Sequence, residues 1–137
     1  MVATTAPQAD PRFPMSARCL LAGLLLMFSS AGSAQERGDW VLGRWQQGAY
    51  WFPGVVESRA GDHVTIAYDD GTRETLPAHY VRRYDWELGT RVECQWAGGV
   101  DWYPGTITAI SRDGVTLHVL YDDGDREQTR TGACRSQ

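Results

Sequence analysis

The chain has 137 residues, 42% of them hydrophobic and 11% aromatic, enough for one ordinary domain or two very small ones. Its net charge is −4, and all 13 basic residues are arginine. An acidic chain repels phosphate backbones, so this charge argues against a nucleic-acid partner and favours a cationic one.

The first feature in chain order is an uncharged apolar run, residues 20–28, which follows Arg18 and precedes the small residues 29–34. A basic start, a short apolar stretch and a small-residue exit are typical of a secretory signal peptide. The run is too short for a membrane span, which takes about 20 apolar residues. A buried N-terminal helix is the alternative. We predict that residues 1–34 are a signal peptide, with Met15 as an alternative start.

Removal of this segment takes away Arg12, Arg18 and Asp10 and leaves a slightly more acidic chain. The predicted location of that chain is periplasmic or secreted, without stable insertion in the membrane.

A repeat of about fifty residues occupies the rest of the sequence. The segment 45–56 matches 96–107 at one constant offset, with Trp, Gly, Trp, an aromatic residue and Pro-Gly in the same order. Further on, 68–74 matches 121–127, again with Tyr-Asp-Asp-Gly followed by Arg-Glu, at an offset two residues larger. Two dense blocks in the same order indicate an internal duplication.

Each copy has the pattern of short β-strands. Residues 63–68 and 115–121 alternate apolar and other side chains, as half-buried strands do, and Asp69-Asp70-Gly71 is a typical hairpin turn. Five short strands in about 50 residues can bury their apolar faces only by curling into a small barrel. We therefore predict an all-β fold of two tandem five-stranded barrels, at residues 38–83 and 89–135.

These motifs resemble the Tudor family, within the wider group of Tudor-like, agenet-like and SH3-like barrels. The resemblance rests on a strand that ends in Trp, an aromatic stretch with Gly after it, and a later aromatic-Asp-Asp-Gly hairpin. Both copies carry the three parts in order, so the resemblance covers nearly all of the predicted mature chain.

The resemblance implies an aromatic cage in each copy. In methyl-binding members of the family, aromatic rings and one carboxylate surround a methylated cation, which is held by cation–π attraction. The positions that match are Trp45, Phe52, Tyr68 and Asp70 in the first copy and Trp96, Tyr103, Tyr121 and Asp123 in the second. Tyr50 or Trp51 could add a ring to the first cage. The alternative is that these rings are ordinary barrel core.

Two cysteines, Cys94 and Cys134, remain after residue 34, and an oxidising compartment favours a disulfide between them. Alternation places Cys94 on one strand face with Val92 and Trp96. Cys134 occupies the place of Val81 in the closing strand, close to the first strand in Tudor-like barrels. Two free buried thiols are the alternative.

No pattern of catalytic residues is evident, and the three histidines, at 63, 79 and 118, lack metal-ligand spacing. Asp122-Asp123-Gly124-Asp125 is too compressed for a calcium loop. The Arg-Glu pair after each hairpin is predicted to be an exposed cross-strand pair of small energetic weight.

We expect a non-catalytic binding module without cofactor or metal, which engages a cationic group of a protein partner. A structural protein of the cell envelope with aromatic core residues is the second hypothesis. A host-directed effector is a third.

Overall fold

The computed structural model describes residues 35–137; the predicted signal peptide lies outside the described residues. The first half of the described chain contains strands β1 (Trp40–Arg44), β2 (Trp51–Ala60), β3 (His63–Tyr68), β4 (Arg73–Pro77) and β5 (Val81–Arg83). The second half contains β6 (Arg91–Gln95), β7 (Trp102–Ile110), β8 (Thr116–Tyr121), β9 (Arg126–Arg130) and β10 (Cys134–Arg135). Single 3-10 turns follow the first and fourth strands of each half, as η3 (Trp45–Gln47), η4 (Ala78–Tyr80), η5 (Trp96–Gly98) and η6 (Thr131–Ala133).

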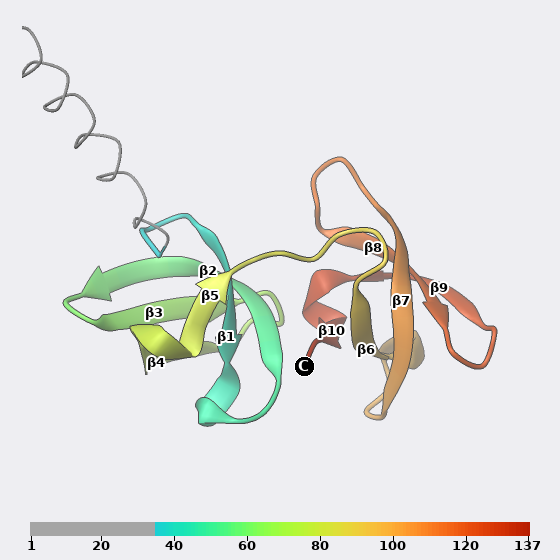
Figure 1. Ribbon diagram of the computed structural model, residues 1–137, viewed down its shortest axis with the longest axis horizontal. Helices are drawn as coiled ribbons and strands as arrows, with labels where there is room; N and C mark the ends of the chain where they lie inside the picture. Colours follow the sequence, from blue (N-terminus) through green and yellow to red (C-terminus); the bar gives the residue numbers. More distant parts are fainter. Residues whose placement is uncertain (1–34) are drawn as a thin grey trace, which may run out of the picture. The chain divides into compact units, whose positions relative to one another are not determined.

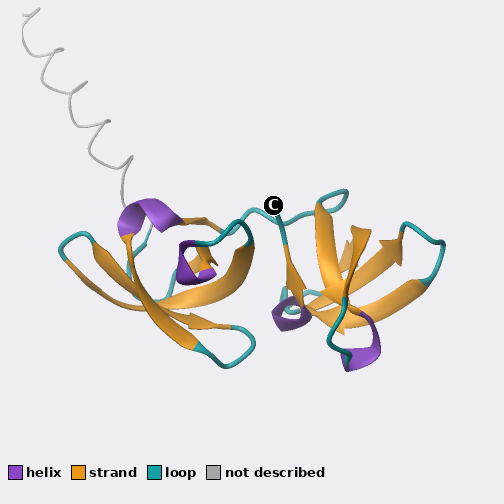
Figure 2. Cartoon of the chain, turned by 90° about the horizontal axis from the view of Figure 1, so that it is seen from below, coloured by secondary structure: helices purple, strands orange, loops and turns teal. Residues whose placement is uncertain are grey.

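The strands form two antiparallel sheets of the same topology (Figures 1 and 2). The orders are β4-β3-β2-β1-β5 and β9-β8-β7-β6-β10, so each strand of one half has a counterpart in the other. This confirms the predicted all-β fold of two five-stranded SH3-like barrels. We call them barrel 1 (β1–β5) and barrel 2 (β6–β10). No helix in the described part of the chain is long and apolar enough to cross a membrane.

The repeated Pro-Gly dipeptide marks a close strand crossing. A Cβ atom at Gly54 would lie 2.7 Å from the carbonyl oxygen of Ala67, and one at Gly105 would lie 2.9 Å from that of Leu120. Only glycine therefore lets β2 and β7 approach the neighbouring strand closely enough.

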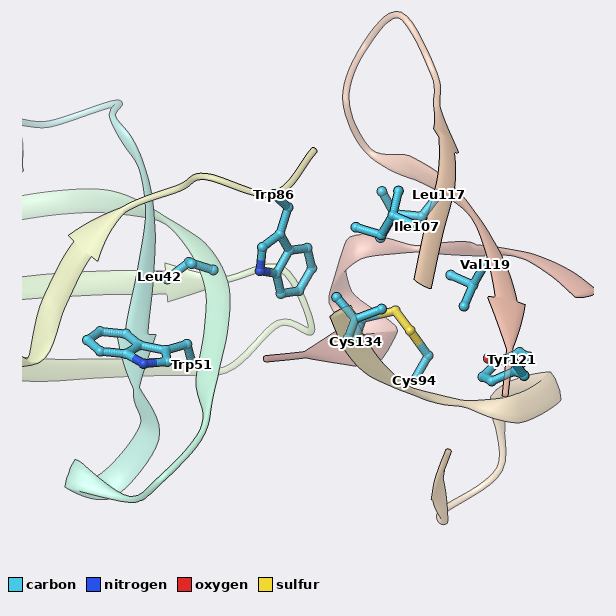
Figure 3. Packing of buried hydrophobic residues seen from close by; sticks show 10 residues of the cluster. Leu42, Trp51, Trp86, Cys94, Ile107, Leu117, Val119, Tyr121 and Cys134 are labelled. Atoms are coloured by element: carbon cyan, nitrogen blue, oxygen red, sulfur yellow. A yellow bond between two sulfur atoms is a disulfide. The ribbon is translucent and has the colours of Figure 1, made fainter. Parts of the chain in front are cut away.

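In β3 and β8, the third strand of each barrel, buried and less buried side chains alternate, and the buried ones contribute to the two cores. The core of barrel 1 consists of seven buried residues, among them Ile66, which is fully buried. The core of barrel 2 is larger because three residues from outside barrel 2, Leu42, Trp51 and Trp86, join it. Figure 3 shows Trp86 between Leu42 and Trp51 on one side and the core of barrel 2 on the other. The two barrels thus share apolar contact through the connecting segment.

Backbone pairing reinforces this contact. Trp51 in β2 and Ser136 exchange two hydrogen bonds, in which the Trp51 N–H donates at 2.7 Å and the Ser136 N–H at 3.0 Å. The Trp86 indole N–H donates to the Ser136 hydroxyl at 3.2 Å, and the Thr131 hydroxyl donates to Asp69 at 2.6 Å. The segment that follows β10, the closing strand of barrel 2, is therefore hydrogen-bonded to β2 of barrel 1.

The predicted disulfide between Cys94 and Cys134 is present. The two residues are direct partners in the β6–β10 ladder, with Cα atoms 4.1 Å apart, and both are fully buried. Gly43 and Val81 are paired in the same way in barrel 1. The expectation that Trp96 shares a strand face with Cys94 is wrong, because β6 ends at Gln95 and Trp96 begins η5.

Candidate functional site

A surface pocket of about 190 Å³ lies in barrel 2 where η5, β7 and the β8–β9 hairpin meet. Its lining contains all four cage positions that the resemblance implied for the second copy, together with one further carboxylate. The residues are Trp96, Tyr103, Tyr121, Asp123 and Asp125.

The three rings of this pocket differ in exposure. Trp96 is 41% exposed and Tyr103 is 45% exposed, whereas Tyr121 is 3% exposed. The Trp96 and Tyr121 rings are in edge contact, with centroids 5.6 Å apart and planes at 75°. Trp96 and Tyr103 therefore offer ring surface to a ligand, while Tyr121 belongs mainly to the core.

Glu127 in β9 fixes the geometry of this pocket from behind. Its Oε1 accepts a 2.6 Å hydrogen bond from the Tyr121 hydroxyl, and its Oε2 accepts a 2.7 Å bond from the backbone N–H of Ala97. Ala97 has a φ of 51°, the left-handed region that a residue of its type rarely adopts. One carboxylate thus holds both the ring of Tyr121 and the turn that carries Trp96.

Barrel 1 repeats this arrangement with Glu74, which accepts from the Tyr68 hydroxyl at 2.8 Å and from the Gln46 N–H at 2.8 Å. Burial, followed by the hydrogen bond to glutamate, raises the pKa of Tyr68 and of Tyr121. The sequence pattern predicts both glutamates to be exposed charges of small energetic weight, and their role in holding the tyrosine and the 3-10 turn becomes evident in the structure. The signal was available, because each glutamate follows its tyrosine by six residues in both copies.

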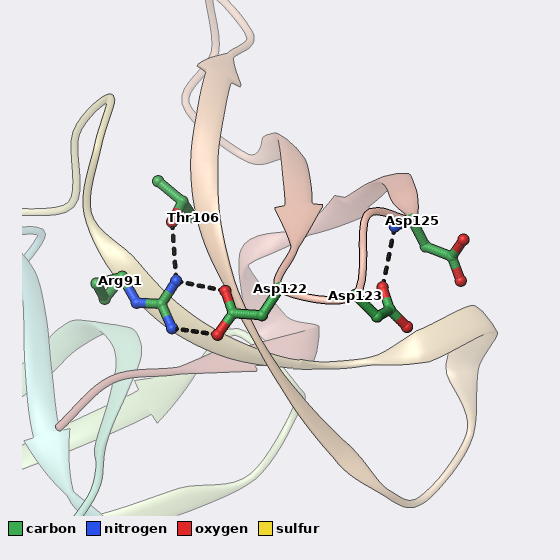
Figure 4. A network of polar contacts seen from close by, with 5 residues as sticks. All are labelled: Arg91, Thr106, Asp122, Asp123 and Asp125. Carbon is green, nitrogen blue, oxygen red and sulfur yellow. Dashed lines mark hydrogen bonds and ion pairs between the residues drawn. The ribbon is translucent and has the colours of Figure 1, made fainter.

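The three aspartates of the β8–β9 hairpin have different hydrogen-bond partners and face two different places (Figure 4). Asp122 faces Arg91, which donates two hydrogen bonds to it at 2.6 and 2.7 Å, and this pairing lowers the pKa of Asp122. Asp123 accepts from the backbone N–H of Asp125 at 2.9 Å across the turn, where Gly124 has a φ of 97°. Asp123 and Asp125 therefore supply the negative charge of the pocket, and Asp122 does not.

The matching rings of barrel 1 also lie together, in a different environment. Tyr68 makes edge contacts with Trp45, at 5.7 Å between centroids, and with Phe52, at 6.4 Å. Phe52 in turn packs edge-on against Trp102 of barrel 2, at 6.0 Å. The ring that corresponds to the exposed Tyr103 is thus half-buried against the neighbouring barrel.

Asp70, the fourth member of that set, is an exposed turn residue. Its Oδ1 accepts hydrogen bonds from the N–H and the hydroxyl of Thr72, at 2.9 and 2.7 Å. It lines a groove with residues 129–133 of barrel 2, and the three rings of barrel 1 are not part of that lining.

Tyr50 and Trp51 do not complete a cage in barrel 1. The guanidinium of Arg135 lies 3.6 Å from the ring centroid of Tyr50 and 4.2 Å from that of Trp102, so an internal cation occupies these ring faces. Trp51 is buried and is covered by the guanidinium groups of Arg44 and Arg82, at 4.7 and 4.3 Å. The suggested fourth ring is wrong for both residues.

Within residues 35–137, no group of three or more His, Cys, Asp or Glu side chains is arranged to hold a metal ion. The pocket of barrel 2 offers open ring faces beside two carboxylates, which suits a cation with an apolar periphery.

No protein-family model matches the sequence, and no curated protein matches it. Among solved structures, the chain is similar to AGDP1 AGD34 of Arabidopsis thaliana, with 14% identity, a TM-score of 0.37 and coverage of 93% of this chain and 92% of that one. It is also similar to the tandem Agenet domain 3-4 of ADCP1, with 14% identity, a TM-score of 0.36 and coverage of 92% and 90%.

Proposed function

We propose that this chain is a non-catalytic binding module that engages a cationic side chain of a protein partner through the pocket of barrel 2. The observation that carries the proposal is the pairing of two open ring faces, Trp96 and Tyr103, with the carboxylates of Asp123 and Asp125. Within residues 35–137, neither carboxylate forms a salt bridge.

The physical basis is cation–π attraction reinforced by charge. Each ring face contributes roughly 0.5–1 kcal/mol to a cation at an exposed site and about 2 kcal/mol when the contact is desolvated. A methylated ammonium or guanidinium suits this pocket because methyl groups spread the charge over a larger, less hydrated surface. The acidity of the chain adds long-range attraction for a basic peptide.

A structural role is the second candidate function, and the contacts of the aromatic residues in barrel 1 support it for those residues. Phe52 packs on Trp102, and Arg135 lies over Tyr50, so these rings hold the barrels together. We therefore assign ligand binding to barrel 2 and the stabilisation of the barrel pair to barrel 1.

Export remains part of the proposal, because the apolar run and the small-residue exit of residues 1–34 are typical of a signal peptide. The disulfide is consistent with an oxidising compartment. Mass spectrometry of the exported protein should find a mature chain that starts near Gln35.

The binding proposal is tested with the processed chain on an array of free and methylated Lys and Arg peptides, each matched with a Gln peptide. We expect binding to the cationic peptides and none to the Gln controls, with a dissociation constant that rises with salt because charge contributes. Equal binding to Gln peptides, or no binding to any peptide, would refute it and favour the structural role.

A further inference from the structure

A second groove lies on barrel 2 across strands β7, β8 and β9. Its volume is about 230 Å³, and it contains neither Trp96 nor Tyr103. The lining residues are Thr108, His118, Val119, Arg126, Glu127 and Gln128. His118 and Gln128 are direct partners in the β8–β9 ladder, and Thr108 occupies the bulge between Ile107 and Ala109.

The equivalent position in barrel 1 contains a carboxylate. Its bulge lies between Val56 and Ser58 and carries Glu57, the counterpart of Thr108. Glu57 forms a salt bridge with Arg73, the counterpart of Arg126, and the hydrogen bond between them raises the pKa of Arg73. In barrel 1, therefore, an internal carboxylate neutralises the arginine of this face.

Barrel 2 lacks that carboxylate, because Thr108 replaces it and its hydroxyl donates to the His118 carbonyl at 3.2 Å. Among residues 35–137, no carboxylate forms a salt bridge with Arg126. Glu127, the acid in the lining, is already engaged on the opposite side of β9 by Tyr121 and Ala97. The groove thus contains Arg126 without a carboxylate partner among residues 35–137, beside the His118 ring and the Gln128 amide.

We propose that this groove binds a carboxylate group supplied by a ligand, in the place that Glu57 occupies in barrel 1. The Arg126 guanidinium provides planar, charge-assisted donors, and the Gln128 amide and the His118 ring add further N–H donors. A carboxylate is the expected anion because a carboxylate completes the equivalent site of the sister repeat. The site does not depend on the cation pocket.

The test is a titration of the processed protein with acetate, followed by NMR of the arginine and glutamine side-chain N–H groups, with chloride at matched ionic strength as the control. We expect saturable shifts at Arg126 and Gln128 with acetate and none with chloride. A blocked Gly-Glu-Gly peptide, compared with Gly-Gln-Gly, shows whether a protein side chain serves as well as a free acid.

Three variants sharpen this test. Arg126→Gln should abolish the shifts at Gln128, and Thr108→Glu should weaken acetate binding roughly two- to fivefold, the fold-change of an exposed ion pair of up to about 1 kcal/mol. Arg112→Gln removes the same charge from the exposed β7–β8 turn and should have no effect. All three positions are exposed, so folding should be unaffected.

The reciprocal variant Glu57→Thr frees Arg73 and should make that residue responsive to acetate. The proposal is overturned if chloride produces the same shifts, or if Thr108→Glu binds acetate as well as the parent does. Acetate binding by Arg126→Gln, at unchanged affinity, would overturn it equally.

Discussion

The same aromatic positions have opposite surroundings in the two barrels. Tyr103 of barrel 2 is 45% exposed beside a pocket, whereas its counterpart Phe52 is half-buried against Trp102. The two barrels are copies of one repeat, and the contact between them determines which aromatic set stays accessible to a ligand. A motif match therefore identifies two candidate cages, but only the packing between the repeats shows which one a ligand can reach.

The largest expected difference between the barrels concerns the disulfide. Replacing Cys94 and Cys134 by alanine removes the bridge across 40 residues and should lower the free energy of unfolding by about 3–4 kcal/mol. Denaturant unfolding of the double variant measures this loss. A difference below about 1 kcal/mol would show that the bridge adds little to the paired strands around it.

Barrel 1 supplies the control for this prediction. Gly43→Cys with Val81→Cys should not form an equivalent bridge without strain, because a Cβ at residue 43 would lie 2.6 Å from Ile66 and 2.7 Å from the Tyr68 hydroxyl. Quantification of free thiols under denaturing conditions detects whether the bridge forms.

The glutamates that hold the 3-10 turns come next. Glu127→Gln leaves one oxygen acceptor where the carboxylate offers two, to the Tyr121 hydroxyl and the Ala97 N–H, and should cost about 1.5–3 kcal/mol, the range for hydrogen bonds to charged groups. Glu74→Gln should cost a similar amount in barrel 1 but should leave ligand affinity unchanged. If both variants lower ligand affinity equally, the assignment of binding to barrel 2 alone is wrong.

The binding difference itself is expected to be smaller. Trp96→Ala should weaken the binding of a cationic peptide by about 1–2 kcal/mol, which raises the dissociation constant roughly 5- to 30-fold. Trp45→Ala should change affinity little. Isothermal titration calorimetry compares the two variants, and equal losses would contradict the division of roles.

Tyr121 is not a suitable residue for that binding test. Its side chain is 3% exposed, and its hydroxyl donates a hydrogen bond to Glu127. Tyr121→Ala should therefore unfold barrel 2 through the cavity it leaves.

The smallest effect concerns alkaline pH. Folding raises the pKa of Tyr68 and Tyr121, so their contribution is complete below the ordinary tyrosine pKa of about 10 and is lost as the pH rises above it. At pH 10.5 the loss is about 0.8 kcal/mol for each tyrosine. Urea unfolding between pH 9 and 10.5 should show this decline, and Tyr68→Phe with Tyr121→Phe should make it shallower, leaving the part due to Tyr84, whose pKa burial raises to about 12.

The sequence predicted the fold well because its signals are local and occur twice. Alternation at Val64, Ile66 and Tyr68 and the hairpin glycine Gly71 both correspond to elements of the structure. The cysteine pair could also be predicted, because Cys94 and Cys134 are the two cysteines that remain after residue 34, and the strand register of the structure places them opposite each other.

The site was only partly predictable, because its state depends on contacts between distant segments. Nothing local to Phe52 shows that Trp102 covers it, and nothing local to Tyr50 shows that Arg135 lies over its ring. Nothing in the sequence shows that Asp125 is the second carboxylate of the pocket, and only the pocket geometry places it there.

The pairing between Trp51 and Ser136 has a consequence for the order of folding. All strands of barrel 1 are synthesised before β6 begins, yet Leu42 and Trp51 pack into an apolar cluster whose other residues follow later in the chain. Barrel 1 must therefore persist for a time with an apolar face open to other molecules. A chaperone with affinity for exposed tryptophan would meet the chain at this stage, and its contact with Trp51 should end once Ser136 pairs.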